Sequence, residues 1–215
     1  MTTRATETGL LIVVSAPSGA GKTSLVNALI ANDPNIVASV SHTTRPQRGN
    51  ERDGENYFFV DVPTFIAMRD AGKFYEHALV FGNYYGTSRA AVETERALGH
   101  DVLLEIDWQG AQQIRLDFPE AVTLFILPPS RAALRQRLRQ RGQDDDDAIA
   151  RRNAAAVAEM AHYAEYDYLV VNDRFDDAVA DLAAIVRAER LRQARQAPRH
   201  QRLLGELLSG PESID

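Results

Sequence analysis

Ser15-Ala-Pro-Ser-Gly-Ala-Gly-Lys-Thr-Ser24 decides the fold of this chain. The apolar run Leu10-Leu-Ile-Val-Val14 precedes it, and an amphipathic segment with apolar residues at 25, 26, 29 and 30 follows it. This order is typical of a strand, a glycine-rich turn and a helix. Because Gly19 and Gly21 have no side chains, backbone N–H groups can surround an anion there, while Lys22 adds a positive charge. The stretch therefore predicts a cradle for the phosphates of a nucleotide.

One position of this cradle departs from the usual pattern G-x-x-x-x-G-K-[ST], since Ala16 stands where the first glycine is usual. Alanine is compatible with that position if its φ angle is negative. The alternative interpretation is an ordinary glycine-rich turn with Lys22 solvated in the first helical turn. The Thr23 hydroxyl is a candidate direct ligand of Mg²⁺. The residues expected to line the phosphate cradle are Ala16, Pro17, Ser18, Gly19, Ala20, Gly21, Lys22, Thr23 and Ser24.

Composition limits the classes of protein to which the chain can belong. Its 215 residues suffice for one domain with a sizeable core, and 45% hydrophobic and 25% charged residues are ordinary for a globular protein. A net charge of −6 argues against a protein built mainly to hold nucleic acid. The sequence has no cysteine, its five histidines show no metal-ligand spacing, and no run reaches the roughly 20 apolar residues of a membrane span. We therefore expect a cytoplasmic protein without nucleic-acid or membrane partners.

Short apolar runs alternate with helical patterns along the chain. The runs are nearly continuous and rich in β-branched residues, which suits strands buried on both faces of a parallel sheet. This layout predicts an α/β fold with sites at the carboxyl ends of the strands. The expected strands are Leu10–Val14, Val102–Ile106, Val122–Leu127 and Tyr168–Val171, and the expected helices are Thr23–Ala31, Gln109–Leu116, Arg131–Arg141, Asp147–Tyr163 and Asp176–Leu208.

Two stretches interrupt this alternation and divide the chain into expected parts. Residues 41–91 are rich in glycine, asparagine, aromatic and charged residues, with a strand expected at 57–60 and a short helix at 62–71, and predict an inserted lobe with its own small sheet. Residues 137–159 are dominated by arginine and aspartate and predict a lid. The core is then expected to comprise 9–40, 92–136 and 160–208, with flexible termini at 1–8 and 209–215.

The inserted lobe carries a second candidate anion site. Arg45 and Arg48 flank Pro46, which keeps Arg45 out of helical geometry, so both guanidinium groups can converge on one phosphate. A solvated basic loop is the alternative. Tyr57 and Tyr85 are candidate phenolic donors to the same anion, although tyrosines near strands are as often packing residues.

Glu76 is the candidate for recognition of a base. It lies in Phe74-Tyr-Glu-His-Ala78, between aromatic and apolar neighbours. A carboxylate held there can accept two parallel hydrogen bonds, which guanine offers from N1–H and its 2-amino group and adenine does not. Sites that bind a polar edge in this way reject analogues that lack it by about 10⁴–10⁵. An exposed glutamate is the alternative, because that is the usual state of this residue.

Glu105 and Asp107 alternate at the end of an expected strand, so both carboxylates face one side. Beside a phosphate cradle, this pair suits a shell around Mg²⁺, with contacts through water, or a pair of acceptors for the substrate. The alternative for Asp107 is an N-cap of the helix that follows. The two interpretations are compatible with each other.

Arg137 and Arg141 are four residues apart and therefore share one helical face. Cations that stabilise the end of a helix are the simpler interpretation. That interpretation leaves the local density of arginine unexplained, because Arg139, Arg151 and Arg152 crowd the same region. A flap whose arginines close on a charged transition state would use Arg137, Arg141 and Arg152.

Together these motifs resemble the guanylate kinase family, and the likeness runs from about residue 11 to 195. The cradle at 15–23 contributes, but the pairing of two other motifs is far more specific. The motifs are Thr43-Thr-Arg-Pro-Gln-Arg48, Gly82-Asn-Tyr-Tyr-Gly-Thr87, Glu105-Ile-Asp-Trp-Gln-Gly110 and Val171-Asn-Asp173. The resemblance implies a P-loop NTPase fold, with a parallel-sheet core, an inserted GMP-binding lobe and an arginine-bearing lid. Members of the family accept alanine at position 16.

The resemblance also implies an activity and a set of roles. The activity would be Mg²⁺-dependent transfer of the ATP γ-phosphoryl group to GMP, giving ADP and GDP in purine nucleotide metabolism. Lys22, Arg45 and the lid arginines would be catalytic, and Asn172 would lie near adenine. Glu105 departs from the aspartate common in the family. The GMP site would comprise Ser41, Arg45, Arg48, Tyr57, Glu76, Tyr85, Thr87 and Asp107.

Two other functions remain open at this point. One is transfer of a phosphoryl group to a different small molecule, against which the neighbourhood of Glu76, Arg45 and Arg48 speaks. The other is a non-catalytic guanylate-kinase-like module, although Lys22 and Thr23 are both present. The long expected helix at the C-terminus can pack on its own core or on a partner, so a homodimer or a higher homo-oligomer is also open.

Overall fold

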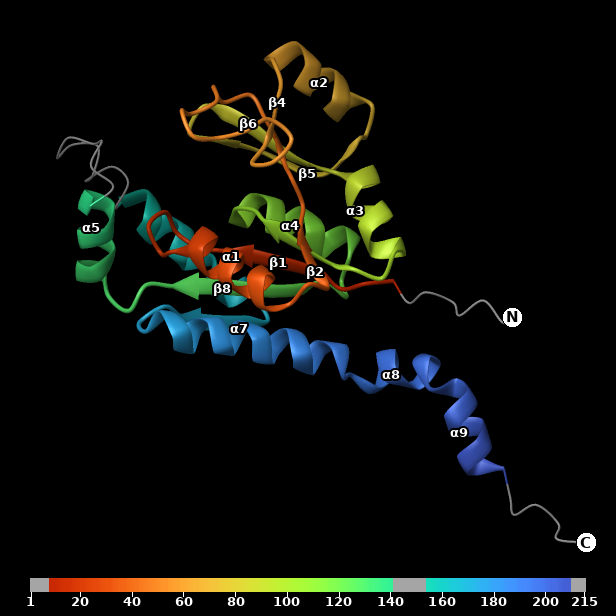
Figure 1. The fold of residues 1–215 in the computed structure, drawn as a ribbon. Coiled ribbons are helices and arrows are strands. Elements are labelled where there is room, and N and C mark those ends of the chain that lie inside the picture. Colours follow the sequence, from red (N-terminus) through yellow and green to blue (C-terminus); the bar gives the residue numbers. More distant parts are fainter. Residues whose placement is uncertain (1–7, 141–153, 210–215) are drawn as a thin grey trace, which may run out of the picture.

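A five-stranded parallel sheet forms the centre of the molecule, as the computed structural model shows for a chain described at residues 8–140 and 154–209 (Figure 1). Each strand is a short apolar run, and β1 is buried along its whole length because helices cover both faces of the sheet. The strand order is β2 (Ile36–Ala38), β7 (Asp101–Glu105), β1 (Leu11–Ser15), β8 (Val122–Leu127) and β9 (Tyr168–Val171).

Helices pack on the two faces through alternate residues of the strands. Ile12 and Val14 of β1 belong to a buried cluster with α1 (Lys22–Asn32) and α7 (Phe175–Arg190). Leu11 and Val13 point to the other face, where the cluster includes residues of α4 (Trp108–Asp117) and α3 (Arg89–Ala97). In Figure 1, α7 runs below the sheet and α4 lies above it. The alternation of one strand thus separates two halves of a single core.

A second, four-stranded sheet stands above α4, and its strand β5 (Phe74–Val80) contacts that helix (Figure 1). Aromatic rings fill it: Phe65 stacks on Phe74 at 4.7 Å and on Tyr84 at 5.3 Å between ring centroids. A Cβ atom at Gly86 would lie 3.0 Å from Phe74 and 3.1 Å from Phe65, so glycine allows these rings to approach the sheet. The strand order is β4 (Phe58–Phe59), β3 (His42–Thr43), β6 (Asn83–Ser88) and β5, with α2 (Val62–Asp70) alongside.

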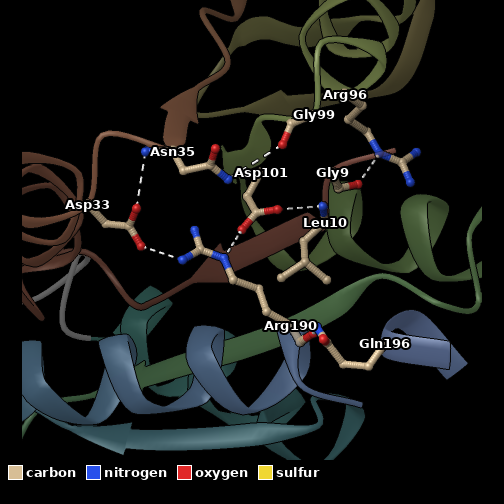
Figure 2. Close-up of polar contacts among 9 residues, drawn as sticks. All are labelled: Gly9, Leu10, Asp33, Asn35, Arg96, Gly99, Asp101, Arg190 and Gln196. Carbon is tan, nitrogen blue, oxygen red and sulfur yellow. Dashed lines mark hydrogen bonds and ion pairs between the residues drawn. The ribbon is translucent and has the colours of Figure 1, made fainter. Parts of the chain in front are cut away.

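Charged side chains join the elements at the amino-terminal edge of the central sheet (Figure 2). Arg190, near the end of α7, donates from Nε to Asp101 Oδ2 and from Nη1 to Asp33 Oδ2, both at 2.6 Å. The other oxygen of Asp101 accepts the backbone N–H of Leu10 at 2.7 Å. Asp101 is only 3% exposed, so its charge is held by these donors and not by water. The contacts fasten α7 and α1 to the start of β1 and β7.

Most of the expected core elements are confirmed. β8 and β9 have the predicted bounds, and β1 and β7 differ from them by one residue. The strand expected at 57–60 is shortened to β4, and the short helix at 62–71 is α2. The division of the chain into core, lobe and lid stays a prediction, and part of the predicted lid lies outside the described residues.

The single long helix expected at Asp176–Leu208 is wrong. The structure breaks it into α7, α8 (Gln193–Arg199) and α9 (Gln201–Leu208), with Pro198 inside α8. The breaks lie at Arg192 (φ −54°, ψ 137°) and at His200 (φ −106°, ψ 18°), where the backbone leaves helical geometry. β2 and α3 were not expected. Elsewhere α5 spans Arg131–Gln140, residues 154–160 are helical, and a 3₁₀ turn follows at Ala161–Glu165.

Within the described ranges, no helix combines the length and apolar character needed to cross a membrane.

Candidate active site

A cavity of about 300 Å³ lies at the carboxyl-terminal edge of the central sheet. The loop after β1 forms one side, the end of β7 and Phe125 of β8 form the floor, and β5 and β6 of the second sheet form the opposite side. Motifs that are far apart in the sequence therefore meet in one space. Among the predicted site residues, the cavity is lined by Ala16, Pro17, Ser18, Gly19, Gly21, Lys22, Thr23, Ser41, Tyr57, Glu76, Tyr85, Glu105 and Asp107.

The glycine-rich loop has the backbone of an anion cradle. Gly19 and Gly21 adopt φ angles of 91° and 94°, which side-chain-bearing residues rarely reach, whereas Ala16 is not among the residues with positive φ. The doubt about alanine at position 16 is thereby removed. Gly21 caps α1 without any side-chain hydrogen bond. The first N–H groups of this helix are therefore left for an anion.

Two residues hold this loop from behind. The Asn172 side chain donates from Nδ2 to the Ala20 carbonyl at 2.7 Å, and Arg137 donates to the same carbonyl at 3.2 Å. Arg137 also donates to the backbone carbonyl of Asn172 at 2.9 Å. A Cβ atom at Gly21 would lie 2.5 Å from Asn172 Nδ2, so only glycine admits this contact. Arg137 and Asn172 therefore support the cradle, and the expected contact of Asn172 with adenine stays a prediction.

Lys22 lies among four carboxylates in the cavity. Its ammonium group donates to the Ile106 carbonyl at 3.4 Å. Burial lowers the pKa of Lys22, and the charges of Glu105, Asp107, Glu159 and Glu76 oppose that shift. A cation in this position is close to acidic groups but has no direct ion pair with them in the described residues. It is available to an incoming phosphate.

Thr23 and Glu105 bring two oxygen ligands together beside the loop. The Thr23 hydroxyl donates to Glu105 Oε2 at 3.1 Å. Mg²⁺ prefers hard oxygen ligands and is usually held by one or two protein groups together with substrate phosphates and water. The described residues contain no cluster of three or more acidic, histidine or cysteine side chains suited to a metal. Thr23 and Glu105 therefore fit an ion that shares its shell with a nucleotide.

Asp107 is the N-cap of α4. Its Oδ1 accepts the backbone N–H of Gly110 at 3.0 Å, and its Oδ2 accepts the side-chain amide of Gln109 at 3.0 Å. The capping interpretation is thus confirmed. The same side chain also lines the cavity, so a capped and oriented carboxylate faces any bound molecule.

Glu76 is a buried carboxylate with one close partner. It is 2% exposed, and its Oε1 accepts the Thr87 hydroxyl at 2.6 Å. Burial raises the pKa of Glu76 to about 7, with the Asp107 charge acting in the same direction and the Thr87 hydrogen bond opposing it. A Cβ atom at Gly110 would lie 2.5 Å from Glu76 Oε2. Glycine at the start of α4 therefore makes room for the second oxygen, and the alternative of an exposed glutamate is wrong.

At the predicted second anion site, the carboxylate of Glu51 interacts with Arg45 and Arg48. Arg45 donates from Nη2 to Glu51 Oε1 at 2.7 Å, and the backbone N–H of Arg48 donates to the other oxygen of Glu51 at 2.8 Å. The Arg45 guanidinium carbon lies 5.4 Å from the centroid of the Tyr57 ring, which is itself 6.0 Å from the ring of Tyr85. The hydrogen bond to Glu51 raises the pKa of Arg45. The structure brings Arg45 and both tyrosines together, while the Arg48 residue is exposed at the edge of this group.

Several residues in or beside the site were not identified from the sequence. Glu51 had no signal in an exposed, charged loop, and Gly110 was quoted only as part of a motif. Glu159 lines the cavity and accepts the backbone N–H of Ser18 at 3.1 Å. Burial raises the pKa of Glu159. The predicted lid residues Arg141 and Arg152 lie outside the described residues.

Comparisons with known proteins agree with this geometry. The family model described as guanylate kinase matches residues 8–189. The chain is 59% identical to a guanylate kinase of Escherichia coli strain K12 over 203 residues, covering 94% of this chain and 98% of the relative. A guanylate kinase of Salmonella typhimurium is 58% identical over the same shares of both chains. A crystal structure of guanylate kinase from Anaplasma phagocytophilum has a TM-score of 0.78 and 35% identity, covering 96% of this chain and 98% of that chain. The chain belongs to the guanylate kinase family.

Proposed function

We propose that this protein transfers the γ-phosphoryl group of ATP to GMP, giving ADP and GDP. The observation that carries the assignment is Glu76, a buried carboxylate that faces the same cavity as the phosphate cradle. Guanine presents two parallel donors to such a group, and adenine presents none in that arrangement. Membership of the guanylate kinase family supports both substrates.

The acceptor oxygen is already an anion, so the reaction needs no protein base. A phosphate oxygen of GMP attacks the γ-phosphorus of ATP, a new P–O bond forms, and the bond to the β-phosphate oxygen breaks. ADP leaves with the electron pair of that bond. The protein must hold two polyanions in line for the transfer. It must also neutralise the negative charges of their phosphates, which repel each other.

The described residues divide this task between the two sides of the cavity. On the donor side, the N–H groups of the loop and Lys22 bind the phosphates of ATP. On the acceptor side, Arg45, Tyr57 and Tyr85 bind the phosphate of GMP, which displaces the Glu51 carboxylate from Arg45. Glu76 with Thr87, together with Ser41 and Asp107, orients guanine. Arg48 joins the phosphate when the lobe closes.

Arg137, Arg141 and Arg152 are proposed to neutralise the transferring group. The contacts of Arg137 with the Ala20 and Asn172 carbonyls support a role through the donor loop. Mg²⁺ would be held by Thr23 directly and by Glu105 and Asp107 through water, and it would supply charge neutralisation at the β- and γ-phosphates. Asn172 is placed to maintain the loop beside it.

A steady-state assay of ADP release tests the assignment. The protein is given Mg·ATP with GMP, AMP, dTMP or no acceptor. We expect turnover with GMP to exceed turnover with every other acceptor by orders of magnitude. Equal rates with AMP would identify a different phosphotransferase. If no acceptor supports the release of ADP, a binding module would be favoured.

We further propose that α9 joins two copies of this chain. Every residue of α9 is exposed, including Leu203 at 47% and Leu207 at 69%. An isolated helix of eight residues is marginal in water, so an apolar partner stabilises it. Light scattering on the full chain should give a mass above one subunit, and the double variant Leu203→Gln, Leu207→Gln should reduce that mass. A monomer in both samples would reject the proposal.

A further inference from the structure

The turn between β5 and β6 places an aromatic residue in an unfavourable backbone conformation. Val80 pairs with Asn83, so Phe81 and Gly82 form a two-residue hairpin loop. Their φ angles are 47° and 78°, and Phe81 is the one residue other than glycine with positive φ in the described part of the chain. Two positive φ angles correspond to a turn that prefers asparagine, aspartate or glycine at this position. A phenylalanine there is strained.

No packing within the described structure compensates for this strain. The Phe81 residue is 69% exposed and belongs to none of the buried clusters or aromatic pairs of the described chain. Exposure of a large aromatic ring is itself unfavourable. Backbone strain and exposed apolar surface therefore coincide at one residue, and both would be relieved by asparagine.

Phe81 nevertheless lines the nucleotide cavity. Ala78 and Val80 of β5 line it too, and Phe81 follows them at the tip of the hairpin. Leu79, between them, is 53% exposed and is not part of the lining, because successive residues of a strand point to opposite sides. On the opposite side of the cavity lie the donor loop and Asp107. Phe81 thus stands at the rim of the space in which the phosphoryl group is transferred.

We propose that Phe81 covers the mouth of the cavity when both nucleotides are bound and keeps water from the γ-phosphate. This inference rests on the proposed function. Water is the competing acceptor: its oxygen attacks the γ-phosphorus, the bond to ADP breaks, and inorganic phosphate forms after loss of a proton to solvent. An apolar ring at the rim lowers the access of water without any contact with the reacting atoms.

The test compares Phe81→Asn with Leu79→Asn on the full protein. Both substitutions remove an exposed apolar side chain from the same hairpin, but only the first faces the cavity and relieves the positive φ. With ATP and GMP present, we measure GDP and inorganic phosphate together. For Phe81→Asn we expect the ratio of phosphate to GDP to rise roughly tenfold while the melting temperature rises. Leu79→Asn should leave the ratio unchanged.

Three outcomes would overturn the inference. An unchanged ratio in Phe81→Asn would show that the ring does not exclude water. A lower melting temperature would show that the ring packs in the free protein, which removes the reason to assign it a role in the closed state. Equal rises in the ratio for both variants would point to the hairpin as a whole. Absence of GMP-dependent turnover in the unaltered protein would instead reject the proposed function, and the inference with it.

Discussion

The two ends of β7 carry acidic residues in opposite electrostatic situations. At its amino-terminal end, Asp101 accepts hydrogen bonds from Arg190 and from the Leu10 backbone, as Figure 2 shows. At its carboxyl-terminal end, Glu105 accepts only the Thr23 hydroxyl among the described contacts and faces a cavity. The first arrangement joins elements of the core. The second leaves polar groups free for molecules that arrive later.

The pKa shifts follow the same division. At the amino-terminal edge, the hydrogen bond from Arg190 holds the pKa of Asp33 below its ordinary value, so the charged form is favoured by folding. In the cavity, burial raises the pKa of Glu76 to about 7 and lowers that of Lys22, so folding disfavours both charges. One edge gains stability from its charges, and the other gives up stability to hold groups that a ligand can satisfy.

Replacing the acid of the cavity should have the largest effect. In Glu76→Gln, the amide nitrogen opposes a donor of guanine and the charge is lost. We expect kcat/KM for GMP to fall on the order of 10³-fold at pH 8, with little change in KM for ATP. Steady-state kinetics with each substrate varied in turn measure this. Glu95→Gln, on α3 and outside the lining of the cavity, is the control, and equal kinetics in the two variants would reject Glu76 as the residue that recognises the base.

Removing the cation at the opposite edge should affect stability and not catalysis. Arg190→Ala leaves the buried Asp101 without its charged partner, and we expect a loss of about 3 kcal/mol in the free energy of unfolding, the lower end for buried pairs because Arg190 is 30% exposed. Urea denaturation measures it. Arg192→Ala removes an arginine whose side chain is 65% exposed and leaves Glu189 its hydrogen bond from Tyr168, so the loss should be smaller than for Arg190→Ala. If both variants unfold alike, the edge is not a specific fastening.

Filling the space beside Glu76 should weaken GMP use without changing any charge. Gly110→Ala places a Cβ atom 2.5 Å from Glu76 Oε2, so the carboxylate must shift. Because a displaced carboxylate no longer fits the bound guanine, we expect a loss on the order of 10²-fold in kcat/KM for GMP. Gly205→Ala, in α9, meets no atom within 4 Å and should leave the kinetics unchanged. Equal activity of Gly110→Ala and the unaltered protein would contradict the close approach.

The smallest expected effect is the pH dependence of KM for GMP. Because the pKa of Glu76 is raised to about 7, the folded protein binds a proton that the unfolded chain loses near 4.5. The contribution of Glu76 to stability therefore falls as pH rises from about 4.5 to 7, whereas the ionised form that accepts both guanine donors becomes available above 7. We expect KM for GMP to rise roughly tenfold from pH 8 to pH 6.

In Glu76→Gln this pH dependence of KM should disappear. A dependence that persists would assign the titration to another group in the cavity or to the phosphate of GMP, whose second pKa is about 6. KM for ATP over the same range serves as the internal control.

Sequence patterns predicted the core strands well and the small elements poorly. The runs that form β8 and β9 are continuous because both faces of the sheet are covered. β2 has only three residues and exists through its pairing with Asp101, Val102 and Leu103 of β7, which no local pattern records. The helical periodicity of the C-terminal stretch was real, but it concealed the interruptions at Arg192 and His200 that separate α7, α8 and α9.

The candidate site shows the same limit. Residue types that can bind phosphate, magnesium and guanine were evident, and the structure gathers most of them around one cavity. The partner that each group has in the folded protein was not evident. Glu51 on Arg45, Glu159 on the Ser18 N–H and Asn172 on the Ala20 carbonyl join residues 6, 141 and 152 positions apart.

The sequence by itself determined the candidate chemistry: a predicted phosphate cradle, a predicted second anion site and a carboxylate in apolar surroundings, each encoded by neighbouring residues. The tertiary structure alone decided which of those groups are neutralised and which stay free. Hydrogen bonding and desolvation depend on distances between segments that the chain brings together only on folding. That is why Asp101 and Glu105, four positions apart on one strand, have different partners and different surroundings.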